Sequence, residues 1–216
     1  APECPGADEV IAEALRLGIA VSIGHTTADL TQVNEAVRRG ATLVTHLFNA
    51  MSPLGSRQPG TVGAALSNDE LTISLIADGV HVHPASMKIA ARAKQNERVV
   101  LITDAMAPLG TEMRSFELYG ETIEVRDGSC FRSDGVLAGS VLSMDRAVRN
   151  MRQLASVEVT DALVMASSNP ARVIGLEDVT GSLAPGLAAD IVICDDEANV
   201  WLTMVDGEIC YRAPEK

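Results

Sequence analysis

Three apolar runs in this chain each end on a histidine, and a fourth ends on an aspartate. They cover residues 19–25, 41–46, 71–81 and 98–104, and their last residues are His25, His46, His81 and Asp104. Helix-like segments separate the runs, which is the pattern of parallel strands alternating with helices. Because side chains at the carboxyl ends of β/α-barrel strands converge on one pocket, the pattern predicts an α/β fold carrying a metal hydrolase site.

Local signals place the elements around these strand ends. Apolar residues at helical spacing predict a helix over 8–17, and N-cap candidates after His25 predict another that ends near Val37. Pro84 suits the first turn of a helix that runs to about Gln95. The first hundred residues therefore predict four strands with covering helices.

The pattern changes after Asp104. We expect strands at 116–125 and 129–137 joined by an Asp127-Gly128 turn, helices at 141–154 and 160–168 with Asn169-Pro170 ending the second, and short strands at 190–194, 200–205 and 208–211 with an Asp206-Gly207 turn. This tail predicts a small β domain.

The strand count leaves two architectures open. A closed barrel needs eight strands and typically about 250 residues, whereas four strand-helix units precede the tail. Either the sheet is open and doubly wound, or the chain is the carboxyl part of something longer. The segment Ala1-Pro2-Glu3 resembles the exit of a strand and favours the second option.

The charge and composition of the chain limit the classes of partner that it can bind. The chain has 17 basic and 29 acidic residues, a formal net charge of −12, which disfavours nucleic acid and anionic membranes. No apolar run approaches the roughly 20 residues of a membrane span, and no signal peptide is visible, so a cytoplasmic location is expected. The four cysteines form no Cys-x-x-Cys pair and are expected to be reduced.

Several motifs resemble those of the N-acetylglucosamine-6-phosphate deacetylase family, in the amidohydrolase superfamily. They are Gly24-His25-Thr26, the segment 45–51 (THLFNAM), Arg57-Gln58-Pro59-Gly60, the segment 77–81 (ADGVH), Thr103-Asp104-Ala105, the segment 135–140 (GVLAGS) and the segment 181–190 (GSLAPGLAAD). The resemblance implies the second half of an amidohydrolase-type TIM (β/α)8 barrel over 1–174, with a β-hairpin insertion near 114–137. It also implies a small β-sandwich part over 175–216. The family's glutamate metal ligand lies on a strand upstream of this sequence.

His25 and His46 are one strand-helix unit apart, so they are expected on neighbouring strands where they can share a cation. Neutral imidazole suits zinc best, although iron or another divalent metal also accepts nitrogen ligands. The alternative is that each is a hydrogen-bonded core histidine. The resemblance favours metal ligation.

The resemblance also implies the other roles. Asp104 matches the catalytic general base, and Arg57 matches the residue that binds the phosphate, often across a dimer interface, which implies a homodimer. The remaining substrate contacts implied are Asn49, Ala50, His81, Leu137, Ala138 and Gly139. Ala138 stands where the family has serine, so a backbone contact is expected there.

Three hypotheses for function follow. The first is a metal-dependent deacetylase that converts N-acetylglucosamine 6-phosphate and water to glucosamine 6-phosphate and acetate. The second is another amidohydrolase, acting on a different acylamino sugar or a cyclic amide. The third is an inactive fragment that serves only as a binding or assembly module.

Overall fold

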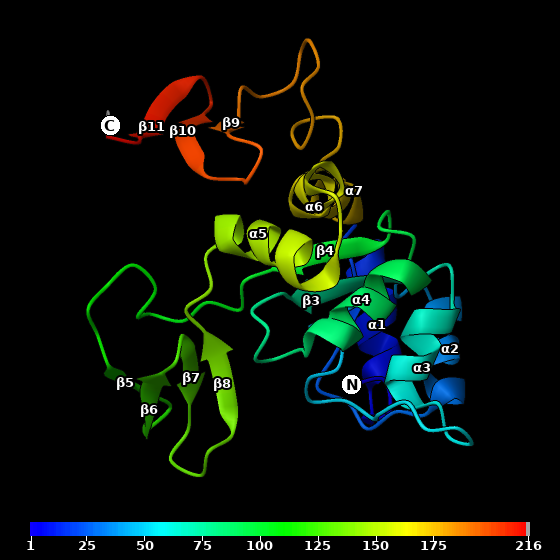
Figure 1. Ribbon diagram of the computed structural model, residues 1–216. Coiled ribbons are helices and arrows are strands. Elements are labelled where there is room, and N and C mark those ends of the chain that lie inside the picture. Colours follow the sequence, from blue (N-terminus) through cyan, green and yellow to red (C-terminus); the bar gives the residue numbers. More distant parts are fainter. Residues whose placement is uncertain (215–216) are drawn as a thin grey trace.

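A four-stranded parallel sheet organises the first half of the chain in the computed structural model, which describes residues 1–214 (Figure 1). Its strands are β1 (Ser22–Ile23), β2 (Leu43–Val44), β3 (Thr72–Ile76) and β4 (Val99–Ile102), in that spatial order. Helices α1 (Ala7–Arg16), α2 (Leu30–Arg38), α3 (Gly60–Ser67) and α4 (Pro84–Ala93) alternate with them. The predicted α/β class with a parallel sheet is confirmed.

Burial explains why these segments form strands and helices. All five residues of β3 are buried, as in a parallel strand covered on both faces. Helix α2 starts at a capping box in which Asp29 and Gln32 each bond the other's backbone N–H. Helix α4 has Pro84 in its first turn, as predicted. Helix α3 was not anticipated, because most of its residues are buried and it lacks an amphipathic pattern.

Three further helices lie against β4: α5 (Met144–Ala155), α6 (Val159–Ala166) and α7 (Ser168–Val173). The helix predicted over 160–168 ends at Ala166, just before the expected Asn169-Pro170 stop, and these two residues lie in a further helix that begins at Ser168. Proline is tolerated there since the first-turn N–H groups of a helix have no intrahelical partner. The Asn169 side chain donates to the carbonyls of Asn96 and Val99, which fixes α7 beside β4.

The segment after β4 forms a second sheet, visible at the lower left of Figure 1. Its strands are β5 (Ser115–Leu118), β6 (Glu121–Arg126), β7 (Ser129–Phe131) and β8 (Leu137–Ser140), all antiparallel in sequence order. The expected hairpin is therefore a four-stranded meander. The predicted strand 116–125 breaks at Tyr119-Gly120, where both residues have positive φ, and 129–137 breaks into β7 and β8.

The last three strands form a separate antiparallel sheet, shown in red and orange in Figure 1. They are β9 (Ile191–Cys194), β10 (Val200–Val205) and β11 (Glu208–Arg212). The two turns predicted from Asp-Gly pairs are confirmed: Asp127-Gly128 and Asp206-Gly207 each join adjacent antiparallel strands with φ positive at both residues. Glu215 and Lys216, the end of the predicted 175–216 domain, lie outside the described residues. Over residues 1–214, the structure contains no helix of the length and apolar character needed to cross a membrane.

Candidate metal and catalytic site

Two imidazoles meet where neighbouring parallel strands end. Nε2 of His25 lies 2.9 Å from Nε2 of His46, and the two rings are nearly perpendicular, with centroids 4.7 Å apart. Strand β1 leads into His25 and β2 leads into His46, and these strands pair in parallel with Ile23 opposite Val44. The register of the sheet therefore brings the two histidines together.

The backbone turns sharply at each of these strand ends. His25, His46 and Asp104 all have left-handed φ values, of 44°, 33° and 50°. Such a conformation costs a non-glycine residue about 1–2 kcal/mol, and residues held in it cluster at functional sites. The shared conformation distinguishes these three strand-end residues from the interior of the strands.

Hydrogen bonds hold both histidine turns in place. The backbone N–H of His46 donates to Oγ of Ser74 over 2.8 Å, which ties it to β3. After His25, the carboxylate of Glu3 accepts from the hydroxyl of Thr26 and from the backbone N–H of Thr27. The two turns are joined directly by the Thr26 N–H, which donates to the Ala50 carbonyl.

The electrostatics keep His46 in the form that a metal requires. Burial lowers the pKa of His46, and the neighbouring His25 lowers it further, against a weaker opposing effect of Asp104. A neutral imidazole is the ligand form for divalent metals. Asp104 is itself solvent-exposed and close enough to His46 for its charge to act on that ring.

The histidine pair fits two positions of a metal site. Only one hydrogen fits between the two facing Nε2 atoms, and Nδ1 of His46 is buried without a hydrogen-bond partner in the described chain. A cation bound to both Nε2 atoms would use both lone pairs. Within residues 1–214, no group of three or more His, Cys, Asp or Glu side chains is placed to hold a metal.

Strand β8 supports the turn at Asp104. The backbone N–H of Ser140 donates to the Asp104 carbonyl over 2.9 Å, and its hydroxyl donates to the Thr103 carbonyl over 2.5 Å. Gly139 adopts a φ of 116°, and a Cβ there would lie 2.5 Å from Cγ of Met106 and 3.0 Å from the Asp104 carbonyl oxygen. The 137–139 segment, predicted to contact substrate, therefore lies against Asp104 because residue 139 is glycine.

His81 follows β3, the strand between those that lead to His46 and Asp104. Its Nδ1 lies 2.6 Å from Oδ2 of Asp78, and both side chains are almost fully buried. His83, two residues on, instead caps helix α4 by accepting the N–H of Ala85. The structure thus separates the roles of the two nearby histidines.

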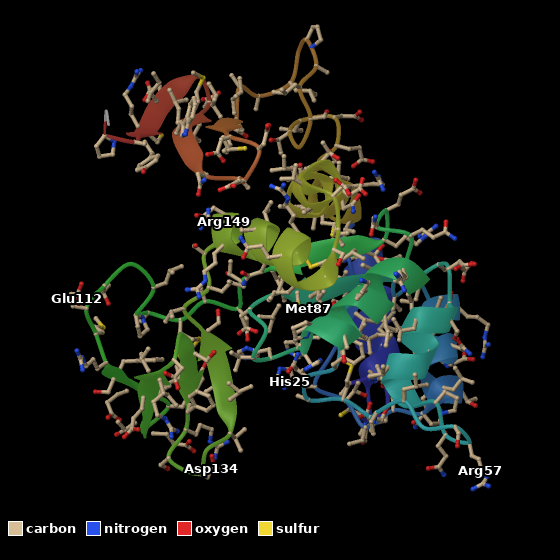
Figure 2. All side chains as sticks on the ribbon, viewed as in Figure 1. His25, Arg57, Met87, Glu112, Asp134 and Arg149 are labelled. Carbon is tan, nitrogen blue, oxygen red and sulfur yellow. The ribbon has the colours of Figure 1, made fainter. Side chains whose placement is uncertain are left out.

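The remaining predicted contacts are divided between the site and the surface. Asn49 lies beside His46, donating to the His46 and Leu47 carbonyls, and Ala50 bonds the turn after His25. Arg57 is exposed on the loop before α3, and Figure 2 shows it well away from His25. Within one chain, the structure does not bring Arg57 to the histidine pair.

Sequence reasoning missed several supporting residues: Glu3, Ser74, Asp78 and Ser140. Asp78 carried a visible signal, because it lies three residues before His81 in a quoted motif. Ser140 carried the same kind of signal, because it is the last residue of the quoted motif 135–140. Ser74 carried none, since it lies outside the motifs and 28 positions from His46.

Comparison with known proteins gives the family. The sequence model of the amidohydrolase family matches residues 2–210. A Bacillus subtilis protein named N-acetylglucosamine-6-phosphate deacetylase is 39% identical over all of this chain and 54% of its own length. An Escherichia coli O157:H7 protein named N-acetylgalactosamine-6-phosphate deacetylase is 40% identical over 97% of this chain and 55% of its own length. The chain spans about half the length of these curated relatives.

Similarity to solved structures indicates the same family. The chain is similar to N-acetylglucosamine-6-phosphate deacetylase from Pasteurella multocida, with a TM-score of 0.92 and 34% identity over 96% of this chain and 54% of that one. It is also similar to a D267A mutant of the Mycobacterium smegmatis deacetylase in complex with N-acetyl-D-glucosamine-6-phosphate, with a TM-score of 0.89 and 36% identity over 97% of this chain and 56% of that one. The motifs, the parallel sheet and these matches agree: the chain belongs to the amidohydrolase family.

Proposed function

We propose that this chain carries part of the active site of a metal-dependent deacetylase that hydrolyses the acetamide of N-acetylglucosamine 6-phosphate to glucosamine 6-phosphate and acetate. The observation that carries the proposal is the convergence of the Nε2 atoms of His25 and His46 close to Asp104. The names of relatives about 40% identical supply the substrate class.

We propose that His25 and His46 hold a divalent metal through Nε2, with zinc the first choice and iron an alternative. Two nitrogen ligands do not complete such a site, so further ligands come from outside the described residues. Since the chain spans about half the length of its relatives, the rest of a longer protein is the expected source. A bound metal of this kind lowers the pKa of water toward about 7.

The proposed roles of the other residues follow from their placement. Asp104 accepts a proton from the attacking water and passes it to the nitrogen of the departing amine, which requires an accessible carboxylate. Its exposure at the end of β4 supports this role. His81 contacts the acetylated sugar. The sugar is positioned by Asn49, Ala50 and the backbone of Leu137, Ala138 and Gly139.

Arg57 is proposed to bind the phosphate in the partner's site of a homodimer. A guanidinium binds phosphate oxygens through two parallel hydrogen bonds. The position of Arg57, exposed and distant from His25, supports action on a second copy of the chain. In a chain with a formal net charge of −12, an anionic substrate needs such a local cation.

A second candidate substrate is N-acetylgalactosamine 6-phosphate. The relative named for that sugar is as similar to this chain as those named for the glucosamine sugar. The two substrates are epimers that present the same acetamide and phosphate, so the same residues serve either.

We also propose a cytoplasmic location, which the absence of a disulfide among the described cysteines supports.

The test is to assay the intact protein for release of acetate from both 6-phosphorylated sugars, with metal analysis of the same sample. We expect turnover of at least one sugar, loss of activity with a chelator and recovery on adding zinc. The ratio of kcat/KM between the two epimers decides the substrate. Absence of both bound metal and turnover would instead favour a binding or assembly module.

A further inference from the structure

The Asp78–His81 pair is a buried, directed contact beside the proposed site. Oδ2 of Asp78 lies 2.6 Å from Nδ1 of His81, and the side chains are 7% and 4% exposed. Hydrogen bonds to charged groups that are this short are stronger than neutral ones, and burial shields the contact from water. The pair therefore determines how the His81 ring is oriented.

Three further hydrogen bonds hold Asp78 and the residue before it in place. Its Oδ1 accepts the backbone N–H groups of Val80 and His81, each over 2.8 Å. The residue before it is anchored by Asn150, whose side-chain amide donates to the Ala77 carbonyl over 2.7 Å. With Oδ1 occupied by two donors, only Oδ2 faces the imidazole.

While it is ionised, the Asp78 carboxylate accepts hydrogen bonds but cannot donate one. Burial raises the pKa of Asp78, but the hydrogen bonds from the His81 ring and from the two backbone N–H groups together outweigh burial and hold it below its ordinary value. Because Asp78 is then ionised near neutral pH, the hydrogen of the contact belongs to Nδ1 of His81.

With the hydrogen on Nδ1, Nε2 of His81 carries the free lone pair of the ring. In the described chain the His81 ring has a hydrogen-bond partner only at Nδ1, and Nε2 is not among the buried atoms left without a partner. Strand β3 lies between β2 and β4, so His81 leaves the sheet between His46 and Asp104.

We propose that Asp78 is a positioning residue, which holds His81 in the Nδ1–H tautomer and so presents Nε2 to the substrate. The proposal rests on the proposed deacetylase activity for its consequence in turnover, but not for the tautomer itself. Asp78 touches no substrate; it acts through His81. An aspartate behind a histidine fixes both the ring tautomer and the ring orientation, and replacing it with asparagine inverts the tautomer.

The tautomer is measured directly by ¹H–¹⁵N NMR of the intact, zinc-loaded protein, labelled at histidine. This chain contains four histidines, so single His→Gln variants assign its signals. At a pH where the His81 ring is neutral, we expect the hydrogen on Nδ1. A hydrogen on Nε2 with a bare Nδ1 would overturn the proposal, and this reading needs no variant of Asp78.

Asp78→Asn tests the cause. The asparagine oxygen still accepts the two backbone N–H groups, so its NH₂ group faces Nδ1 and should drive the hydrogen to Nε2. We expect kcat/KM to fall by about 10- to 100-fold, the usual effect of removing an outer partner of an active-site histidine. Asp134→Asn is the matched control, because Asp134 also accepts the N–H two residues ahead but lies on the β7–β8 turn, away from His25 (Figure 2).

A double-mutant cycle separates positioning from general stability. In a His81→Gln background, Asp78→Asn should cause no further loss of kcat/KM, because its effect passes through the missing ring. Equal losses in both backgrounds would overturn the proposal. If the wild-type protein shows the Nδ1–H tautomer but no deacetylation, the proposed function fails while the tautomer assignment stands; full activity of Asp78→Asn would remove the positioning role alone.

Discussion

Nε2 of His25 and Nε2 of His46 lie 2.9 Å apart although the residues are 21 positions apart in sequence. The contact follows from parallel pairing of β1 with β2, which places the two strand ends at the same edge of the sheet. One hydrogen between the two Nε2 atoms makes this contact a hydrogen bond, and a cation bound to both atoms would take its place.

The histidine pair should control metal content. We expect His46→Ala to weaken binding of zinc by at least about tenfold, because one of two nitrogen ligands is removed. Metal content after dialysis, measured by mass spectrometry, checks this. His83→Ala is the control, since His83 only caps α4; equal metal loss in both variants would exclude the pair as ligands.

Asp104 should matter for turnover and not for metal content. Asp104→Asn keeps the size of the side chain but removes the proton acceptor, so we expect kcat to fall by at least about 10². Steady-state kinetics and metal analysis of the same preparation test both statements. Near-normal kcat would rule out the role of general base.

Arg57 should act on a second subunit. Arg57→Ala should mainly raise KM for the phosphorylated sugar and hardly affect an unphosphorylated analogue. Mixing Arg57→Ala with Asp104→Asn protein should restore activity, because each mixed dimer holds one site with an intact Asp104 and an intact partner Arg57. If subunits exchange and mixing restores nothing, phosphate binding across a dimer interface is wrong.

Gly139 should be needed for the approach of β8 to Asp104. An alanine Cβ would lie 2.5 Å from Met106 Cγ, and the φ of 116° is unfavourable for any L side chain. We expect Gly139→Ala to lower the free energy of unfolding by about 2–3 kcal/mol. Gly135→Ala is the control, because its φ is also positive while a Cβ there meets open space. Equal losses in urea unfolding would show that backbone strain alone is responsible.

Lys94 should make stability rise at alkaline pH. Its buried ammonium donates to the carbonyls of Ala65 and Asn68, and burial lowers its pKa to about 8 from an ordinary value of 10.5. Between these two values the unfolded chain holds more protons, so the free energy of unfolding increases with pH, by at most about 3 kcal/mol. Below pH 8 the lysine is protonated in both states and adds no dependence.

Urea unfolding at several pH values between 8 and 10.5 measures this slope. Lys94→Met should lose it, even though the variant is less stable at every pH because two carbonyls lose their donor. Lys88→Met should keep it, since Lys88 is only half-buried and its ammonium donates to the Ser156 hydroxyl. An unchanged slope in Lys94→Met would contradict the assignment.

Much of the fold could be predicted because it depends on short-range rules. The Asp127-Gly128 and Asp206-Gly207 turns follow from the positive φ that such hairpin turns require. The start of α4 at Pro84 follows from its missing N–H. The breaks inside 116–125 and 129–137 were missed, because alternation continues across Tyr119-Gly120 and does not mark a turn.

The sequence by itself determined which residues stand at the ends of the parallel strands, since each apolar run stops at a histidine or an aspartate. The sequence also predicted that His25 and His46 lie on neighbouring strands. Only the tertiary structure decided that their Nε2 atoms face each other, that Ser140 holds the turn at Asp104, and that Arg57 lies away from the histidine pair. These relationships depend on strand register and on packing between segments up to 37 positions apart. Local sequence patterns encode backbone conformation, whereas the distance between two side chains is set by every element packed between them.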